Sequence, residues 1–168
     1  MTRDLAYSLR TLEPSDAAAY NAFLRQGVLA HPDTLRISPA DIDAAPFKTP
    51  NTAEGCTLAA LTPNGDWLGV VTVERESGRE KRRHIAWIYR MYVAASAAGQ
   101  GLGRALMAAA IGRAEQLPGV TKLNLTVAAH NLRAVALYEA AGFVPFSREP
   151  DAFRDPEPRV ELSMSRVL

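Results

Sequence analysis

Cysteine is nearly absent from this sequence, since Cys56 is the single cysteine among 168 residues. One cysteine cannot form a disulfide within the chain, and this is typical of proteins kept in a reducing compartment. Cys56 begins an apolar run and is predicted to be a buried structural thiol rather than a nucleophile. The sequence also lacks a run long and apolar enough for a membrane span, and its first residues lack the pattern of a signal peptide. We therefore expect a cytoplasmic protein with no membrane partner.

An excess of charge of one sign is also missing, because 19 lysines and arginines balance 18 aspartates and glutamates. A broad nucleic-acid surface would show a basic excess, so no nucleic-acid partner is expected. We expect no metal either. The hydrophobic fraction of 48% suffices for a sizeable core, and the length suits one domain over residues 1–168.

Apolar periodicity and turn residues predict alternating strands and helices. Strands are predicted over residues 5–12, 56–61, 67–74, 84–93, 120–127, 143–147 and 159–167, and helices over 17–29, 103–116 and 131–141, with one more short helix starting at Ser38. The strand over 84–93 is apolar at both parities, which indicates a central strand covered on both faces. The order predicts an α/β (α+β) fold, a mixed sheet with helices on both faces in three layers.

A glycine-rich turn joins this central strand to the next helix and reads Gly99-Gln100-Gly101-Leu102-Gly103. Its glycines permit positive φ and close approach of a ligand, and the helix N-terminus supplies free amides that favour a phosphate. A nucleotide-binding P-loop is excluded because Arg104 and Ala105 stand where lysine and a hydroxyl residue are needed. The dinucleotide fingerprint fails as well, since Leu106 occupies the position of its last glycine. At this point two interpretations fit the residues: a turn that binds a phosphate, and a tight turn that binds no ligand.

Two segments together carry a family resemblance. Met91-Tyr92-Val93, followed by Ala98 to Met107, resembles the cofactor motif of the GNAT superfamily of N-acetyltransferases. Asn131 to Phe143 resembles the second signature of that family, in the family's order and separation. The resemblance implies an acyl-CoA-dependent N-acetyltransferase with the three-layer GNAT fold. That fold has a mostly antiparallel sheet of about seven strands, a splayed central parallel pair and about four helices.

The resemblance also implies roles in binding acetyl-CoA. Backbone groups of the segment Met91, Tyr92 and Val93 would pair with the pantetheine arm, and the Val93 amide would polarise the thioester carbonyl. The amides from Gly99 to Arg104 would bind the pyrophosphate. Asn131 would contact the pantetheine, although an asparagine there also serves as a helix N-cap without any ligand.

Tyr138 is the predicted catalytic acid, because the family commonly carries a tyrosine there that protonates the departing CoA thiolate. Ala98 departs from the family's usual arginine or glutamine and leaves the phosphate site more dependent on backbone amides.

The general base is not identified by sequence. Trp87 stands where some relatives carry a glutamate. Glu74, Glu76 and His84 are the remaining base candidates, but each is more typical of a surface charge, and ordered water is the other route for the proton. Arg90 is a lone charge in an apolar strand, so it either binds an acidic substrate group or extends to solvent. We predict that Arg90, Trp87 and Glu74 lie on the side of the site that receives the substrate.

Direct transfer to a primary amine of a small molecule or peptide is the expected reaction, since no nucleophile stands beside the turn. A non-catalytic acyl-CoA sensor and an acetyltransferase of protein N-termini or lysines are the alternatives. Residues 17–52 and 147–158 are expected to form the variable walls of the substrate cleft. The chain would act as a monomer or homodimer.

Overall fold

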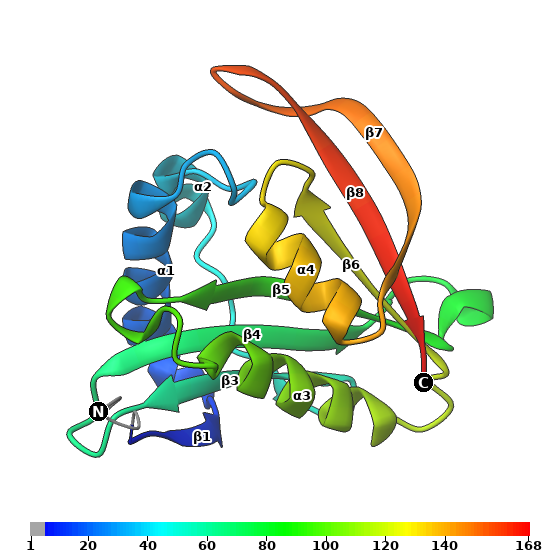
Figure 1. Cartoon of the computed structure of the whole chain (residues 1–168). Coiled ribbons are helices and arrows are strands. Elements are labelled where there is room, and N and C mark those ends of the chain that lie inside the picture. Colours follow the sequence, from blue (N-terminus) through cyan, green and yellow to red (C-terminus); the bar gives the residue numbers. More distant parts are fainter. Residues whose placement is uncertain (1–5) are drawn as a thin grey trace.

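The computed structural model describes residues 6–168, and these form helices packed on a sheet (Figure 1). Its strands are β1 (Ser8–Thr11), β2 (Asn51–Thr52), β3 (Gly55–Leu61), β4 (Trp67–Arg75), β5 (Ile85–Val93), β6 (Lys122–Ala128), β7 (Val144–Asp155) and β8 (Glu157–Val167). Its α-helices are α1 (Ala17–Ala30), α2 (Pro39–Ala44), α3 (Leu102–Glu115) and α4 (Leu132–Ala140). The strands form one sheet in the order β1-β3-β4-β5-β6-β8-β7, with β2 paired to β3. All described pairings are antiparallel except that of β5 with β6.

The predicted mixed α/β fold is confirmed, with differences at its margins. The first strand is shorter than predicted, and residue 5 of that prediction lies outside the described residues. The predicted strand over residues 143–147 instead continues to Asp155 because β7 and β8 form a long hairpin. Residues 157–160 of β8 extend past the end of its pairing with β6, so the tip of the hairpin projects from the sheet (Figure 1). The two-residue strand β2 was not predicted.

The helices cover opposite faces of the sheet. The helix α1 buries Tyr20, Phe23 and Leu24 against one face, together with Val70 of β4. The short helix α2 starts at a capping box, in which Ser38 accepts a hydrogen bond from the Asp41 amide. The helices α3 and α4 contribute to a larger cluster on the other face. Its members include Leu58, Val71, Ala86, Ile88, Leu102, Leu106, Met107, Leu125, Tyr138 and Phe143.

The parallel pairing between β5 and β6 is short and ends in the middle of the sheet. It joins Ile85 to Lys122, Ala86 to Leu123 and Trp87 to Asn124. Beyond these pairs each strand continues, to Val93 and Ala128, without pairing to the other. Hydrogen bonds to the outer neighbours β4 and β8 persist along these stretches, so the sheet opens into two halves. The predicted splayed central pair is thereby confirmed.

A β-bulge at Arg90 changes the direction of side chains along β5. The pairing with β4 runs from Thr72–Tyr89 to Val70–Tyr92, so two residues of β5 oppose one of β4. Arg90 adopts a positive φ of 49°, which is uncommon for a residue with a side chain. The extra residue places Met91 on the α3 face and Tyr92 on the α1 face, the reverse of what alternation from Ala86 and Ile88 would give. The strict alternation predicted for residues 84–93 would have placed Met91 on the face of Tyr89.

Two glycines offer a matched test of this packing. A methyl group on Gly55 would lie 2.5 Å from the Val73 carbonyl oxygen, whereas one on Gly112 meets nothing within 4 Å. Gly55→Ala should therefore lower the free energy of unfolding by about 1–3 kcal/mol through forced strand displacement. Gly112→Ala should raise it by up to about 1 kcal/mol, since alanine favours the helix. Chemical denaturation of both variants measures these changes, and an unaltered Gly55→Ala midpoint would contradict the described β3–β4 contact.

Candidate functional site

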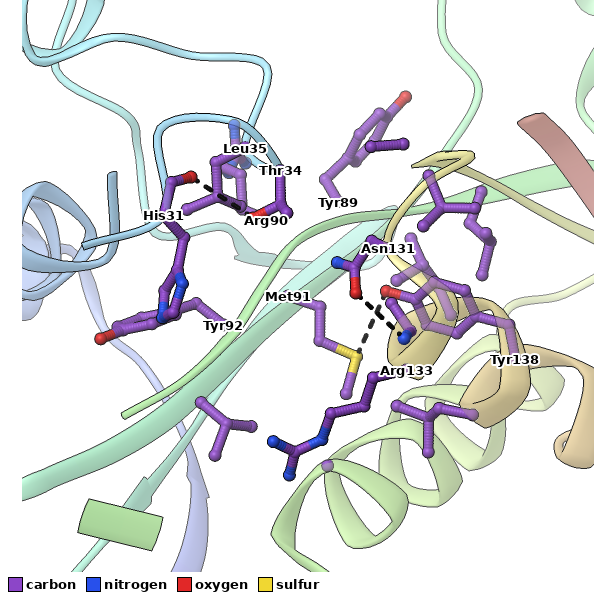
Figure 2. A pocket seen from close by; sticks show the side chains of 18 of the residues that line it. His31, Thr34, Leu35, Tyr89, Arg90, Met91, Tyr92, Asn131, Arg133 and Tyr138 are labelled. Atoms are coloured by element: carbon purple, nitrogen blue, oxygen red, sulfur yellow. Dashed lines mark hydrogen bonds between the residues drawn. The ribbon is translucent and has the colours of Figure 1, made fainter. Parts of the chain in front are cut away.

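A cavity of about 720 Å³ lies where β5 and β6 diverge. One wall consists of residues 88–93 of β5, and the opposite wall consists of residues 125–128 of β6. The glycine turn, the first turn of α3 and the inner side of α4 close it on one face of the sheet. On the other face the lining residues come from α1 and the segment after it: Leu24, His31, Thr34, Leu35, Arg36, Ile37 and Phe47. Figure 2 shows Met91 between Tyr92 and His31 on one side and Tyr138 on the other.

The unpaired edges of the two strands face this cavity. Backbone N–H and C=O groups that leave a sheet must find another partner or water. The edge of β5 beyond Trp87 and the edge of β6 beyond Asn124 have no strand partner across the gap within the described residues. The cavity therefore offers extended backbone that can pair with a strand-like ligand.

The glycine turn presents free amides to the same cavity. Gly99 and Gly101 have positive φ values of 76° and 79°, which glycine adopts without strain. Gly101 is the N-cap of α3 and makes no side-chain capping hydrogen bond. The first amide within this helix to reach an intrahelical carbonyl is that of Ala105, which donates to the Gly101 oxygen. The amides of residues 102–104 consequently remain available to an anion, and the helix dipole favours that anion.

Tyr138 and Asn131 line the α4 side of the cavity. The Tyr138 side chain is 8% exposed, and its hydroxyl donates to the Met91 sulfur at 3.9 Å (Figure 2). Burial raises the pKa of this phenol to about 12, so the hydroxyl keeps its proton at neutral pH. The Asn131 side-chain oxygen accepts from the Ala134 amide and caps α4. Its amide nitrogen is left for other partners.

Arg36, in the segment that follows α1, contacts the half of the split sheet that contains β6 and β8. Its guanidinium forms an ion pair with Glu161 of β8 at 2.6 Å and donates to the Thr126 hydroxyl of β6 at 2.6 Å. His130 and Asp33 make a second contact of this segment, at 3.3 Å. Burial is the main cause that raises the pKa of Glu161, and Arg36 opposes that rise. The segment after α1 thus contacts the β6 wall of the cavity, a role that the sequence did not indicate.

The structure brings most of the predicted site residues together. The cavity lining includes Arg90, Met91, Tyr92, Val93, Gly99, Gly101, Leu102, Gly103, Arg104, Asn131 and Tyr138. Arg36, Tyr89, Phe47 and Arg133 also line it and were not singled out from the sequence.

Gln100, Trp87 and Glu74 do not line the cavity. The Gln100 side chain instead donates to the Ser96 carbonyl oxygen at 2.9 Å. The Trp87 indole donates to Glu76 at 2.9 Å and stacks on Tyr89, while Glu74 lies opposite Trp87 on β4.

The two other candidate bases also lie apart from the cavity lining. The Arg82 guanidinium, with the Trp87 indole, holds the pKa of Glu76 at about 2. Glu76 is therefore ionised but already occupied by its partners, and His84 is absent from the lining as well. Among the described residues no cluster of three or more potential metal ligands occurs, and no helix has the length and apolarity needed to span a membrane.

The sequence also matches a known family over most of its length. The model of the acetyltransferase (GNAT) family matches residues 18–143. The chain belongs to the GNAT acetyltransferase family. Mycothiol acetyltransferase of Salinispora tropica is 32% identical over 141 residues, which span 83% of this GNAT chain and 45% of that relative. The chain thus spans less than half the length of the curated relatives it matches.

Solved structures share the fold of this GNAT chain. A GCN5-related N-acetyltransferase from Kribbella flavida superposes with a TM-score of 0.81 at 27% identity, over 97% of this chain and 98% of the other. A putative acetyltransferase from Salmonella typhimurium, solved with its cofactor acetyl-CoA, has a TM-score of 0.78 at 19% identity, over 96% and 94%. These likenesses, together with the family match, confirm the predicted GNAT fold.

The raised pKa of Tyr138 predicts how stability responds to alkaline pH. An unfolded tyrosine ionises near 10.0, whereas folded Tyr138 holds its proton to about 12. The unfolded chain therefore loses this proton first, and the free energy of unfolding falls as pH rises through this window, by up to about 3 kcal/mol. Tyr138→Phe should lack this contribution.

Denaturant titrations of wild type and Tyr138→Phe from pH 9 to pH 12, a range set by the ordinary and raised values, measure the difference. Burial also raises the pKa of Tyr20, Tyr89 and Tyr92, but these are common to both proteins and cancel in the comparison. Parallel stability curves for the two proteins would contradict the burial of an ionisable phenol at this position.

Proposed function

We propose that this GNAT chain is an N-acetyltransferase that transfers the acetyl group of acetyl-CoA to a primary amine of a small molecule or peptide. One observation carries the proposal. A single cavity combines unpaired strand edges, uncapped amides at a glycine turn and a buried, protonated phenol. Each feature matches one part of acetyl-CoA: the amide-bearing pantetheine arm, the pyrophosphate and the thioester sulfur.

The binding roles follow from the chemistry of these groups. The edge of β5 at Met91 and Val93 would pair with the pantetheine amides as a strand does. The free amides of residues 102–104 would hold the pyrophosphate at the N-terminus of α3. Arg104 and Arg133 line the same cavity from the first turns of α3 and α4, and their positive charge supports phosphate binding.

The transfer step places Tyr138 at the leaving group. The neutral amine nitrogen forms a bond to the thioester carbon and gives up one proton to water, and collapse of the tetrahedral intermediate breaks the carbon–sulfur bond. The CoA sulfur then takes the phenol proton of Tyr138, which recovers a proton from solvent. The hydroxyl already points at a sulfur atom, that of Met91, so a second sulfur nearby would meet a ready donor.

A sensor that binds acetyl-CoA without catalysis is the second candidate. It is favoured by one observation, since no aspartate or glutamate is among the lining residues of the cavity to accept the amine proton. Calorimetry with acetyl-CoA, followed by detection of free CoA thiol across a panel of primary amines, separates the two functions. Thiol release that depends on an amine supports the transferase, and tight binding without release on any amine supports the sensor.

Tyr138→Phe tests the acid role directly. Loss of the proton donor should lower kcat by roughly 100-fold, within the usual contribution of general acid catalysis. The Kd for acetyl-CoA should stay nearly constant, because the ring and its packing on Phe143 are retained. Tyr7→Phe removes a hydroxyl outside the cavity and serves as the control. Full turnover of Tyr138→Phe at saturating substrate would exclude the acid role.

Gly101→Ala tests the phosphate-binding turn. The positive φ of 79° would strain an alanine by about 1–2 kcal/mol and displace the amides that follow. We expect the Kd for acetyl-CoA to rise by about 10-fold, a shift that corresponds to about 1.4 kcal/mol. Gly65 has a similar φ of 88° in a hairpin turn outside the cavity, so Gly65→Ala provides equal strain without the binding defect. Equal affinities of both variants would argue against this turn as the phosphate site.

A further inference from the structure

The charges that line the cavity are all of one sign. Among residues 6–168, the lining contains four arginines and one histidine but no aspartate or glutamate: Arg36, Arg90, Arg104, Arg133 and His31. Arg104 and Arg133 belong to the first turns of α3 and α4, where the cofactor phosphates are proposed to bind. Arg36 is already paired with Glu161. Arg90 is therefore the arginine of the lining whose charge has no assigned partner.

Arg90 lies on the α1 side of the strand that carries Met91. Its guanidinium lies over the Phe47 ring, 4.6 Å from the centroid, and 5.9 Å from that of Tyr89. Its charge also opposes the rise that burial causes in the pKa of the neighbouring Tyr20 phenol, which is a neutral group. The Arg90 Nε atom is buried with no hydrogen-bond acceptor, and Arg90 forms no ion pair with any residue in the described range 6–168. Arg90 lines the cavity together with Leu35 and Thr34, across from Tyr138 in Figure 2.

A partly buried guanidinium without an ion pair destabilises the folded protein unless an anion binds to it. Partial burial removes hydration from the charge, and the attraction to a neighbouring aromatic ring offsets only part of the lost hydration free energy. The backbone at Arg90 is also held at a positive φ within the bulge, and such strained positions cluster at ligand sites. A planar guanidinium is well matched to a carboxylate, which it binds through paired hydrogen bonds.

We propose that Arg90 binds the carboxylate of the acceptor, so that the preferred substrates are amines of the amino-acid kind, bearing an acid close to the amine. The inference rests on the proposed transferase function and specifies its substrate class. Arg90 and Tyr138 line the same cavity from opposite walls, so an acid held by Arg90 would leave its amine free inside the cavity that receives the thioester. The absence of acidic side chains from the lining disfavours polyamines and other polycationic acceptors.

Matched acceptors test this proposal. L-amino acids and their carboxamides differ only in the acid, and kcat/KM for each pair is measured by CoA thiol release. Wild type should favour the acids by about 10–100-fold, the usual range for a charge-assisted hydrogen bond. Arg90→Gln should reduce this preference to near unity by losing activity on the acids alone. Arg90→Lys should retain part of it, because the charge and the contact with Phe47 persist.

A second readout separates this proposal from the transferase function. Calorimetry of the same acids and amides on the CoA-loaded protein measures binding without turnover. If no amine releases CoA but the acids bind wild type and not Arg90→Gln, the transferase proposal fails and the carboxylate site stands. Arg79→Gln makes the same charge change in an exposed turn outside the cavity and should match wild type in both readouts.

The competing role of Arg90 is a tether between β5 and Phe47. A tether predicts that Arg90→Gln lowers the melting temperature and impairs acids and amides equally. That result would overturn the proposal, as would equal use of acids and amides by wild type. A selective loss on acids, with unchanged affinity for acetyl-CoA, would support it.

Discussion

The early end of the parallel pairing between β5 and β6 is the constraint on which the site depends. The two strands share only the pairs from Ile85–Lys122 to Trp87–Asn124 and then diverge, each still hydrogen-bonded to its outer neighbour. A sheet that opens in this way leaves two rows of polar backbone groups facing a gap. The gap forms a cavity of about 720 Å³, and helices and the segment after α1 cover this cavity on both faces of the sheet. An extended ligand with amide groups satisfies such edges better than water-filled space does.

Polar contacts then divide the cavity into two ends with different chemistry. The end at the glycine turn presents amides and two arginines, Arg104 and Arg133, to an anion. At the end under α1, Arg36 ties the segment after that helix to β6 and β8 through Thr126 and Glu161. Tyr138 lines the α4 side of the cavity, and burial keeps its proton in place. This arrangement fits the proposed transfer reaction, in which the phosphates would be held apart from the reacting amine.

Local sequence predicted the elements well, because periodicity, capping and glycine turns depend on neighbouring residues. The turn from Gly99 to Gly103 and the phenol of Tyr138 could be assigned since both lie in continuous motifs. The bulge at Arg90 could not, because its positive φ arises from pairing with β4 and not from a glycine. The lone charge in an apolar strand was the one local sign of it. The contact of Arg36 with Glu161 joins residues far apart in the chain, and no local pattern encodes such a contact.

Backbone hydrogen exchange with and without acetyl-CoA measures whether the strand edge and the glycine turn hold the cofactor. Saturating acetyl-CoA should protect the amides of β5 at Met91 and Val93 and the amides of residues 102–104, because these have no strand or helix partner among residues 6–168. The amides of β3 and β4, which are already paired, should show no comparable change. Exchange at the β5 edge and the glycine turn that stays the same under saturating acetyl-CoA would contradict the account.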